Sequence, residues 1–315
     1  MTFLDAITTS KVILTEGSVI ERLNREISMQ LDPFILNAGL IYDVYGRAVL
    51  GDIYRKYIEL GLKYKLPMIV FAPTWRANPE RIGHSVYRKH ANVNRDCVDF
   101  LNNIRCGHAN DSQNIFIGGL MACRADAYRP EQALSVREAE AFHRLQAKAL
   151  AEAPVDFIMA ATLPAVSEAL GMASALSEFN LPYALSFVIR SDGSILDGTP
   201  LHRAVAQIDA ATAPRPLFYM VNCVHPSIFQ QGIDHELRSS PKLSDRLLGL
   251  QANTSAKSPE ELDGLSYLDT VEPEEFAQSL LSLHKSFGIK ILGGCCGSDN
   301  RHIEEIARQI RQQVF

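Results

Sequence analysis

Short apolar runs alternate with segments of helical periodicity along the whole chain. The runs are continuous rather than alternating, which is the pattern of parallel strands that are buried on both faces. Eight of them predict strands, at Val12–Gly17, Met68–Pro73, Ile115–Leu120, Asp156–Thr162, Tyr183–Arg190, Pro216–Cys223, Leu248–Thr254 and Lys290–Cys296.

The segments between these runs carry helix signals. Apolar side chains recur at helical spacing over 50–61, and Ser135 with Glu138 forms a capping-box pattern before another helix. Gly288 marks the end of a later one. Longer connections predict loops around 24–49, 76–95, 121–134 and 227–247.

Eight strand and helix repeats in 315 residues predict an α/β fold, the (β/α)8 TIM-type barrel, as a single domain over 1–315 with elaborated loops. A doubly wound open sheet is the alternative. No Gly-x-Gly-x-x-Gly follows the first strand, which weighs against a dinucleotide-binding version of that sheet. In a (β/α)8 barrel the chemistry lies at the carboxyl ends of the strands.

Composition narrows the class of protein. The chain is 47% hydrophobic with a net charge of −5, which is ordinary for a globular protein and offers no basic surface for nucleic acid. No apolar run approaches the roughly 20 residues that a membrane span needs, and the first residues do not read as a signal peptide. We therefore expect a cytoplasmic chain with reduced cysteines.

Three cysteines fall at the ends of predicted strands. Cys223 ends the sixth strand, and Cys295 and Cys296 end the eighth, so all three belong to one rim of the barrel. Three thiolates with one open position form the arrangement of a catalytic zinc site. Cys97, Cys106 and Cys123 are instead expected to be small buried hydrophobes.

Glycines surround the adjacent pair of cysteines. Neighbouring side chains of a strand point to opposite faces, so both thiols reach one point only if the chain leaves strand geometry there. Gly297 supplies the positive φ for such a turn, and Gly293 and Gly294 leave room for a metal ion to approach.

Polar and aromatic residues that converge on the same rim are candidates for substrate binding. They are Glu16, Gly17, Thr74, Trp75, Thr162, Ser186, Asn222 and Asn253. The Trp75 ring offers a face for a cationic donor, and Asn222 is placed to hydrogen-bond the sulfurs. We expect His225 to be a loop or capping residue, His302 a solvated helix position and Glu168 an ordinary helix residue.

Several motifs together resemble the zinc-dependent homocysteine S-methyltransferase family over nearly the whole chain. They are Gly293–Gly297 (Gly-Gly-Cys-Cys-Gly), Asn222-Cys223, Leu14–Gly17, Thr74–Asn78 and Asp197–Leu201. The resemblance implies methyl transfer to the sulfur of homocysteine, giving methionine, with Zn²⁺ on Cys223, Cys295 and Cys296. The implied partners are a small thiol acceptor and a small methyl donor, whether a sulfonium, a betaine-like ammonium or a corrinoid-relayed folate. A homo-oligomer is compatible with the resemblance.

Two positions depart from the family pattern. Glu16 stands where the family usually has Asp, and Ala161 stands where it has the Glu that holds the amino group of homocysteine. The same zinc chemistry on a different thiol is therefore an alternative, and a non-catalytic zinc-binding barrel is another. A thiol redox protein fits less well, because there is no Cys-x-x-Cys and adjacent cysteines form a strained disulfide.

Overall fold

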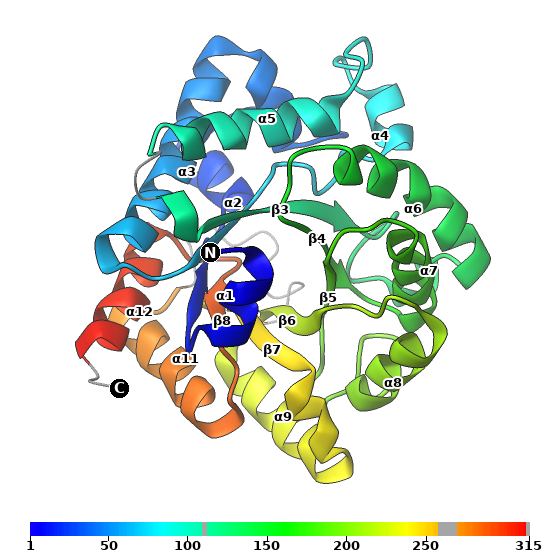
Figure 1. The fold of residues 1–315 in the computed structure, drawn as a ribbon, viewed down its shortest axis with the longest axis vertical. Helices are drawn as coiled ribbons and strands as arrows, with labels where there is room; N and C mark the ends of the chain where they lie inside the picture. Colours follow the sequence, from blue (N-terminus) through cyan, green and yellow to red (C-terminus); the bar gives the residue numbers. More distant parts are fainter. Residues whose placement is uncertain (109–111, 258–269, 313–315) are drawn as a thin grey trace.

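Eight parallel strands close into a barrel in the order of the chain, with β8 paired to β1 (Figure 1). This computed structural model describes residues 1–108, 112–257 and 270–312. The strands are β1 (Ile13–Thr15), β2 (Met68–Phe71), β3 (Ile115–Ala122), β4 (Phe157–Leu163), β5 (Tyr183–Phe187), β6 (Phe218–Val224), β7 (Leu247–Ala252) and β8 (Ile291–Gly294).

Helices surround this barrel on its outside (Figure 1). The α-helices of the described residues are α1 (Phe3–Thr9), α2 (Ile20–Arg25), α3 (Val44–Tyr64), α4 (Pro79–His84), α5 (Val93–Cys106), α6 (Val136–Ala151), α7 (Val166–Ser177), α8 (Leu201–Ala211), α9 (Pro226–Ser239), α11 (Pro273–Phe287) and α12 (Asn300–Gln312). The capping box predicted at Ser135 and Glu138 opens α6, and Gly288 ends α11 with a φ of 71°.

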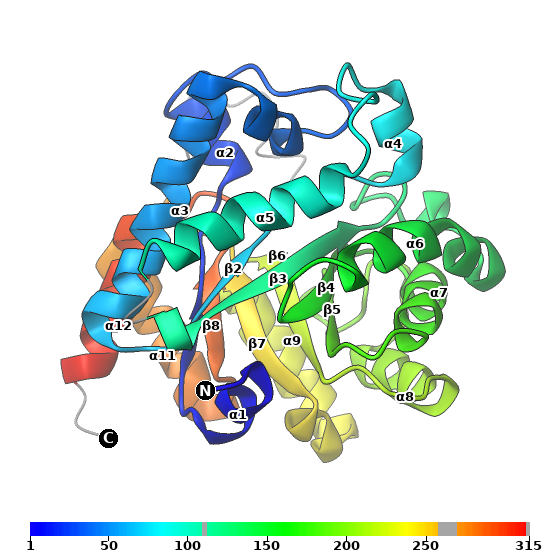
Figure 2. The ribbon, with the colours of Figure 1, turned by 45° about the horizontal axis from the view of Figure 1, so that its top comes forward.

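Helix α1 covers the amino-terminal end of the barrel. The ring of Phe3 stacks on Phe157 with centroids 4.2 Å apart, inside a core that also holds Phe116 and Phe218. Figure 2 shows α1 at the end of the barrel opposite α4 and the segment between α2 and α3. The carboxyl ends of the strands thus face the end that α1 does not cover.

Two strands break their regular pairing near these carboxyl ends. The register shifts between Ala160 and Leu163 in β4, and between Asn222 and Val224 in β6. Thr162 and Cys223 take φ values of 60° and 57° at these points, a conformation that costs free energy for a residue with a side chain. Such irregularities concentrate at functional sites, so both indicate that the rim is a candidate site.

The closed barrel confirms the predicted fold and excludes the open sheet, because an open sheet has no pairing between its first and eighth strands. All eight predicted strands are present, most of them shorter at the carboxyl end than predicted because their last residues leave the ladder. The prediction of a loop at 227–247 was wrong, because α9 and a 3-10 helix at Pro241–Asp245 occupy most of this segment. His225 caps α9, and Pro226 occupies its first turn.

Within the described ranges, none of the helices combines the length and the apolar character that crossing a bilayer would require.

Candidate metal centre

The sulfurs of Cys223, Cys295 and Cys296 all lie within 4.8 Å of one another at the carboxyl end of the barrel. Sulfurs bound to one tetrahedral zinc at about 2.3 Å stand roughly 3.8 Å apart, so a small side-chain adjustment would bring these three to that spacing. Cys223 is buried, and the other two are half-buried. This donor set therefore fits zinc, with the three sulfurs as ligands and one position left for an incoming group.

Local backbone geometry brings the three thiols together. Cys223 occupies the positive-φ position that interrupts β6, and Cys295 and Cys296 follow the last residue of β8 in a turn. Gly297 completes that turn with a φ of 82°, and a Cβ added there would lie 1.8 Å from Thr254 Oγ1. The sequence prediction that the chain leaves strand geometry at this pair is confirmed.

The two preceding glycines leave room for a close approach, as predicted. A Cβ on Gly293 would lie 1.8 Å from Thr15 Oγ1, and one on Gly294 would lie 2.0 Å from Ser298 Oγ. These glycines make room for β1 and for the segment before α12, and the approach of a metal ion to them stays a prediction.

The thiols share protons unequally. Hydrogen bonds from Cys295 and Cys296 hold the pKa of Cys223 well below its usual range, and Tyr128 and Asn222 add to the effect against the opposing influence of burial. The pKa of Cys295 is raised, because its thiol proton is held in a hydrogen bond to the Cys223 sulfur. Cys223 is thus the first thiol to become a thiolate, the form that binds a metal.

Asn222 joins three strand ends around Cys223. Its amide nitrogen donates to Cys223 Sγ at 3.2 Å and to Thr162 Oγ1 at 2.7 Å. Its carbonyl oxygen accepts from the Thr162 N–H at 3.0 Å and from Ser186 Oγ at 2.6 Å. The predicted hydrogen bond to a sulfur is confirmed, and Thr162 and Ser186 lie at the rim as partners of Asn222.

Every backbone N–H and C=O group from Cys295 to Gly297 has a partner among the described residues. The Cys295 N–H donates to Ala252 O at 2.7 Å, and its carbonyl accepts from Ser298 Oγ at 2.7 Å. The Cys296 N–H donates to Asn253 Oδ1 at 3.1 Å, and its carbonyl accepts from the Thr254 N–H at 3.1 Å. Asn253 therefore lies at the rim, in contact with the turn over Cys295–Gly297.

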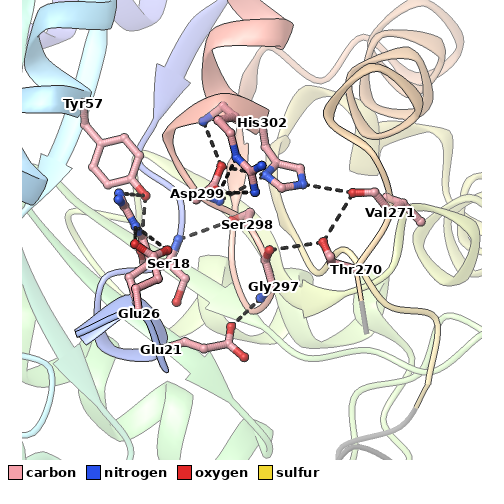
Figure 3. Close-up of polar contacts among 12 residues, drawn as sticks. Ser18, Glu21, Glu26, Tyr57, Thr270, Val271, Gly297, Ser298, Asp299 and His302 are labelled. Carbon is pink, nitrogen blue, oxygen red and sulfur yellow. Dashed lines mark hydrogen bonds and ion pairs between the residues drawn. The ribbon is translucent and has the colours of Figure 1, made fainter. Parts of the chain in front are cut away.

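Gly297 is held from two further elements. Its N–H donates to the carboxylate of Glu21 on α2, and its carbonyl accepts from Thr270 Oγ1 at 3.3 Å (Figure 3). His302 lies beside this turn and is buried, with Nε2 3.1 Å from Val271 O and Nδ1 3.0 Å from Asp299 (Figure 3). The prediction that His302 is a solvated helix position was wrong, because the residue is buried against Val271 and the Phe276 ring of α11.

The remaining predicted substrate residues are held by the protein itself. Glu16 is buried and accepts from the Phe71 N–H at 2.9 Å; burial raises its pKa to about 8. Thr74 bridges to β3 through both the N–H and the carbonyl of Leu120. Gly17 packs against Ser298.

Trp75 is half-buried, and one interaction of its ring is already fixed. The guanidinium carbon of Arg76 lies 4.3 Å from the ring centroid, so a cation of the protein stacks there. A cationic methyl donor would have to use the opposite face of the ring. The role of Trp75 in donor binding stays a prediction.

Tyr128 is a site residue that the sequence analysis missed. It lies in the connection between β3 and α6, is half-buried, and its hydroxyl is one of the groups that lower the pKa of Cys223. The loop that carries it is anchored at both ends by buried Glu168, which accepts from the N–H groups of Arg124 at 2.7 Å and Leu134 at 3.3 Å. The prediction that Glu168 is an ordinary helix residue was wrong.

The other cysteines divide as follows. Cys97 and Cys123 are buried as predicted, whereas Cys106 is exposed because it is the last residue of α5. All six cysteines are free thiols.

A sequence model of the homocysteine S-methyltransferase family matches residues 13–310. Homocysteine S-methyltransferase YbgG of Bacillus subtilis is 30% identical over 62% of this chain and 60% of its own length. Homocysteine S-methyltransferase of Escherichia coli is 29% identical over 54% of this chain and 52% of its own length. The chain thus matches little more than half the length of these relatives.

Solved structures agree on the fold. The metallated form of the Escherichia coli homocysteine methyltransferase MmuM superposes with a TM-score of 0.75, covering 96% of this chain and 98% of that chain at 17% identity. Its oxidised form gives a TM-score of 0.74 at 18% identity. Because the family model extends over nearly the whole chain, the protein belongs to the homocysteine S-methyltransferase family.

Proposed function

We propose that this protein is a zinc-dependent methyltransferase that moves a methyl group from a small donor to the sulfur of homocysteine, giving methionine. The observation that carries the proposal is the meeting of three thiols within 4.8 Å at the carboxyl end of a (β/α)8 barrel. Family membership supports the reaction class, and the relatives named above are homocysteine methyltransferases.

The chain's own residues would prepare the acceptor. Cys223, Cys295 and Cys296 would hold zinc and leave its fourth position to the acceptor thiol. Bound zinc would supply the charge that ionises this thiol, and the thiolate is the nucleophilic form. The new bond joins the acceptor sulfur to the methyl carbon, and the donor leaves with the electron pair of its broken bond. Asn222 would orient the Cys223 sulfur from outside the coordination shell.

A second acceptor class is favoured by a specific observation. Ala161 is buried and apolar, and Glu16 is protonated at neutral pH because burial raises its pKa to about 8. Ala161 offers no charge to a buried ammonium, and Glu16 would offset that charge only after losing its proton, whereas an ammonium without a partner is costly to bury. A thiol without an amino group is therefore the second candidate acceptor.

One experiment tests both candidates. Protein loaded with zinc is supplied with a methylsulfonium or a betaine and with either homocysteine or 4-mercaptobutyrate, which has the same skeleton without the amino group. Methyl transfer to homocysteine supports the first candidate, and transfer to 4-mercaptobutyrate alone supports the second. Stoichiometric zinc without transfer to either thiol would contradict both and favour a non-catalytic barrel.

Cysteine variants provide the matched controls for this assay. Cys223→Ser and Cys296→Ser should lose zinc and activity together, because each removes one of three ligands. Cys106→Ser removes an exposed thiol on α5 and should retain both. We further propose that the protein works on small molecules in a reducing, cytoplasmic setting, in which its thiols stay free.

A further inference from the structure

The two peptide planes on either side of Cys296 are both anchored. In the plane before it, Cys295 O accepts from Ser298 Oγ at 2.7 Å and the Cys296 N–H donates to Asn253 Oδ1 at 3.1 Å. In the plane after it, Cys296 O accepts from the Thr254 N–H at 3.1 Å and the Gly297 N–H donates to Glu21. Because a peptide unit is rigid, a bond at each end fixes its orientation, and two fixed planes fix the direction of the side chain between them.

Glu21 differs from the other partners of this turn. The other partners are all neutral groups. They are the Ala252 carbonyl at the end of β7, the Asn253 side-chain amide and the Thr254 N–H just after it, and the hydroxyls of Ser298 and Thr270. Glu21 supplies a carboxylate from α2, which follows the opposite partner strand of β8, namely β1 (Figure 3). The side chain is 22% exposed and is itself oriented by Arg25 at 3.1 Å.

The glycine at the end of this hydrogen bond makes the anchor more important. Gly297 has a φ of 82°, in a region that glycine enters easily but also leaves easily. Without a partner for its N–H, the Cys296–Gly297 plane would be held at its carbonyl end only. The Cys296 sulfur would then sample positions away from Cys223 and Cys295.

We propose that Glu21 is a positioning residue of the metal centre, whose carboxylate fixes the Cys296–Gly297 peptide plane and thereby the place from which Cys296 coordinates the metal. This inference rests on the proposed function only in requiring that the three thiols bind zinc.

Zinc affinity of the purified full chain tests it, measured by competition with a chromophoric chelator, with Co²⁺ absorption as a second readout. Glu21→Gln keeps an oxygen acceptor at the same reach, Glu21→Asp keeps the charge but is one methylene shorter, and Glu21→Ala removes both. Glu21→Ala and Glu21→Asp should bind zinc about tenfold more weakly, the effect typical of lost outer-shell partners, and Glu21→Gln should lose less than about threefold.

Asp156→Asn is the matched control. Asp156 is also a partly buried carboxylate that accepts a backbone N–H, from Ile117 at 2.7 Å, and pairs with an arginine, Arg105, at 2.7 Å. It lies next to the amino end of β4, so this variant should keep the wild-type zinc affinity even where its melting temperature falls.

Two results would overturn the inference. One is wild-type zinc affinity in a folded Glu21→Ala protein. The other is wild-type affinity in Glu21→Asp together with a loss in Glu21→Gln, since charge rather than position would then matter. A wild-type chain that binds no zinc at all would refute the proposed function itself, so the two failures are distinguishable.

Discussion

At the scale of single residues, burial of Glu16 makes stability depend on pH. Its pKa is about 8 in the folded protein against an ordinary 4.5, so the folded state holds a proton that the unfolded state has released. The folded state is therefore most stable, as far as this group decides, below about pH 4.5, and it loses that stability as the pH rises through about 8.

Replacing Glu16 with Gln should remove this dependence. Gln keeps the acceptor for the Phe71 N–H but cannot ionise. The wild type should lose stability relative to Glu16→Gln between about pH 5 and 8, at up to about 1.4 kcal/mol per pH unit. Urea unfolding at pH 5.5 and 8.5 measures the difference, and parallel pH profiles for the two proteins would refute it.

The sequence identifies some residues of the site and not others, for physical reasons. Cys223, Cys295 and Cys296 were predictable because each follows an apolar run, and strand ends of a parallel barrel share one rim. Glu21 and Tyr128 were not, because one lies on a short helix and the other in a loop, where only tertiary contacts decide the partner. The contacts of Gly293 and Gly294 with Thr15 and Ser298 were not predicted, because only the folded chain brings Thr15 beside β8 and turns Ser298 back onto Gly294.

At the scale of elements, the turn after β8 depends on Gly297. An alanine there would need an unfavourable φ of 82° and would place its Cβ 1.8 Å from Thr254 Oγ1. Gly297→Ala should therefore weaken the proposed zinc binding by at least about tenfold, because it displaces the turn that carries two of the candidate ligands. Gly83→Ala, whose Cβ meets no atom within 4 Å, is the control, and equal zinc affinity in both variants would contradict the account.

The connection between β3 and α6 depends on Glu168. This buried carboxylate accepts from the two loop ends and from His143 Nε2 at 2.8 Å. Burial works to raise its pKa, but these hydrogen bonds outweigh it and lower the pKa, so the group stays charged. Glu168→Gln would leave part of this set unpaired.

We expect Glu168→Gln to cost about 2 kcal/mol of unfolding free energy and to speed trypsin cleavage at Arg129 in the loop. Glu236→Gln is the control. Glu236 lies on α9, is equally buried, and its Oε2 lies 2.8 Å from His202 Nδ1. Glu236→Gln should lose similar stability without faster cleavage at Arg129. Equal cleavage rates in the two variants would show that Glu168 does not hold the loop.

Helices were predictable where capping and periodicity agree, as at Ser135 and Gly288. Helix α9 was missed although Pro226 in its first turn is a helix-start signal, because the segment that follows is mostly polar and charged. Its apolar face is supplied by few residues, among them Phe229 and Ile233, which only the packed structure shows to be buried.

At the scale of the whole molecule, the candidate ligands join β6 and β8 across β7. Zinc binding would therefore stabilise the closed barrel, since the unfolded chain does not hold three sulfurs together. At a free zinc concentration 100 times the Kd, the gain should be about 2.7 kcal/mol. Thermal unfolding with and without zinc measures it; the gain should vanish in Cys296→Ser and persist in Cys106→Ser, and equal gains would contradict the assignment.

The barrel itself was predictable because eight apolar runs with helices between them allow few topologies. Closure was predicted from the number of repeats alone, because the sequence has no local signal for the pairing of Ile13 with Ile291. That pairing decides the site, since it brings the end of β8, and with it Cys295 and Cys296, beside α2 and Glu21.

The central claim is that three sulfurs of this chain bind one zinc ion and leave a position for an acceptor thiol. X-ray absorption at the zinc K edge of the purified, zinc-loaded protein tests it most directly. The account predicts three sulfur neighbours at about 2.3 Å, a fourth sulfur when the thiol acceptor is added, and loss of the sulfur-bound zinc in Cys223→Ser. A first shell of oxygen and nitrogen only, or a shell unchanged in Cys223→Ser, would contradict it.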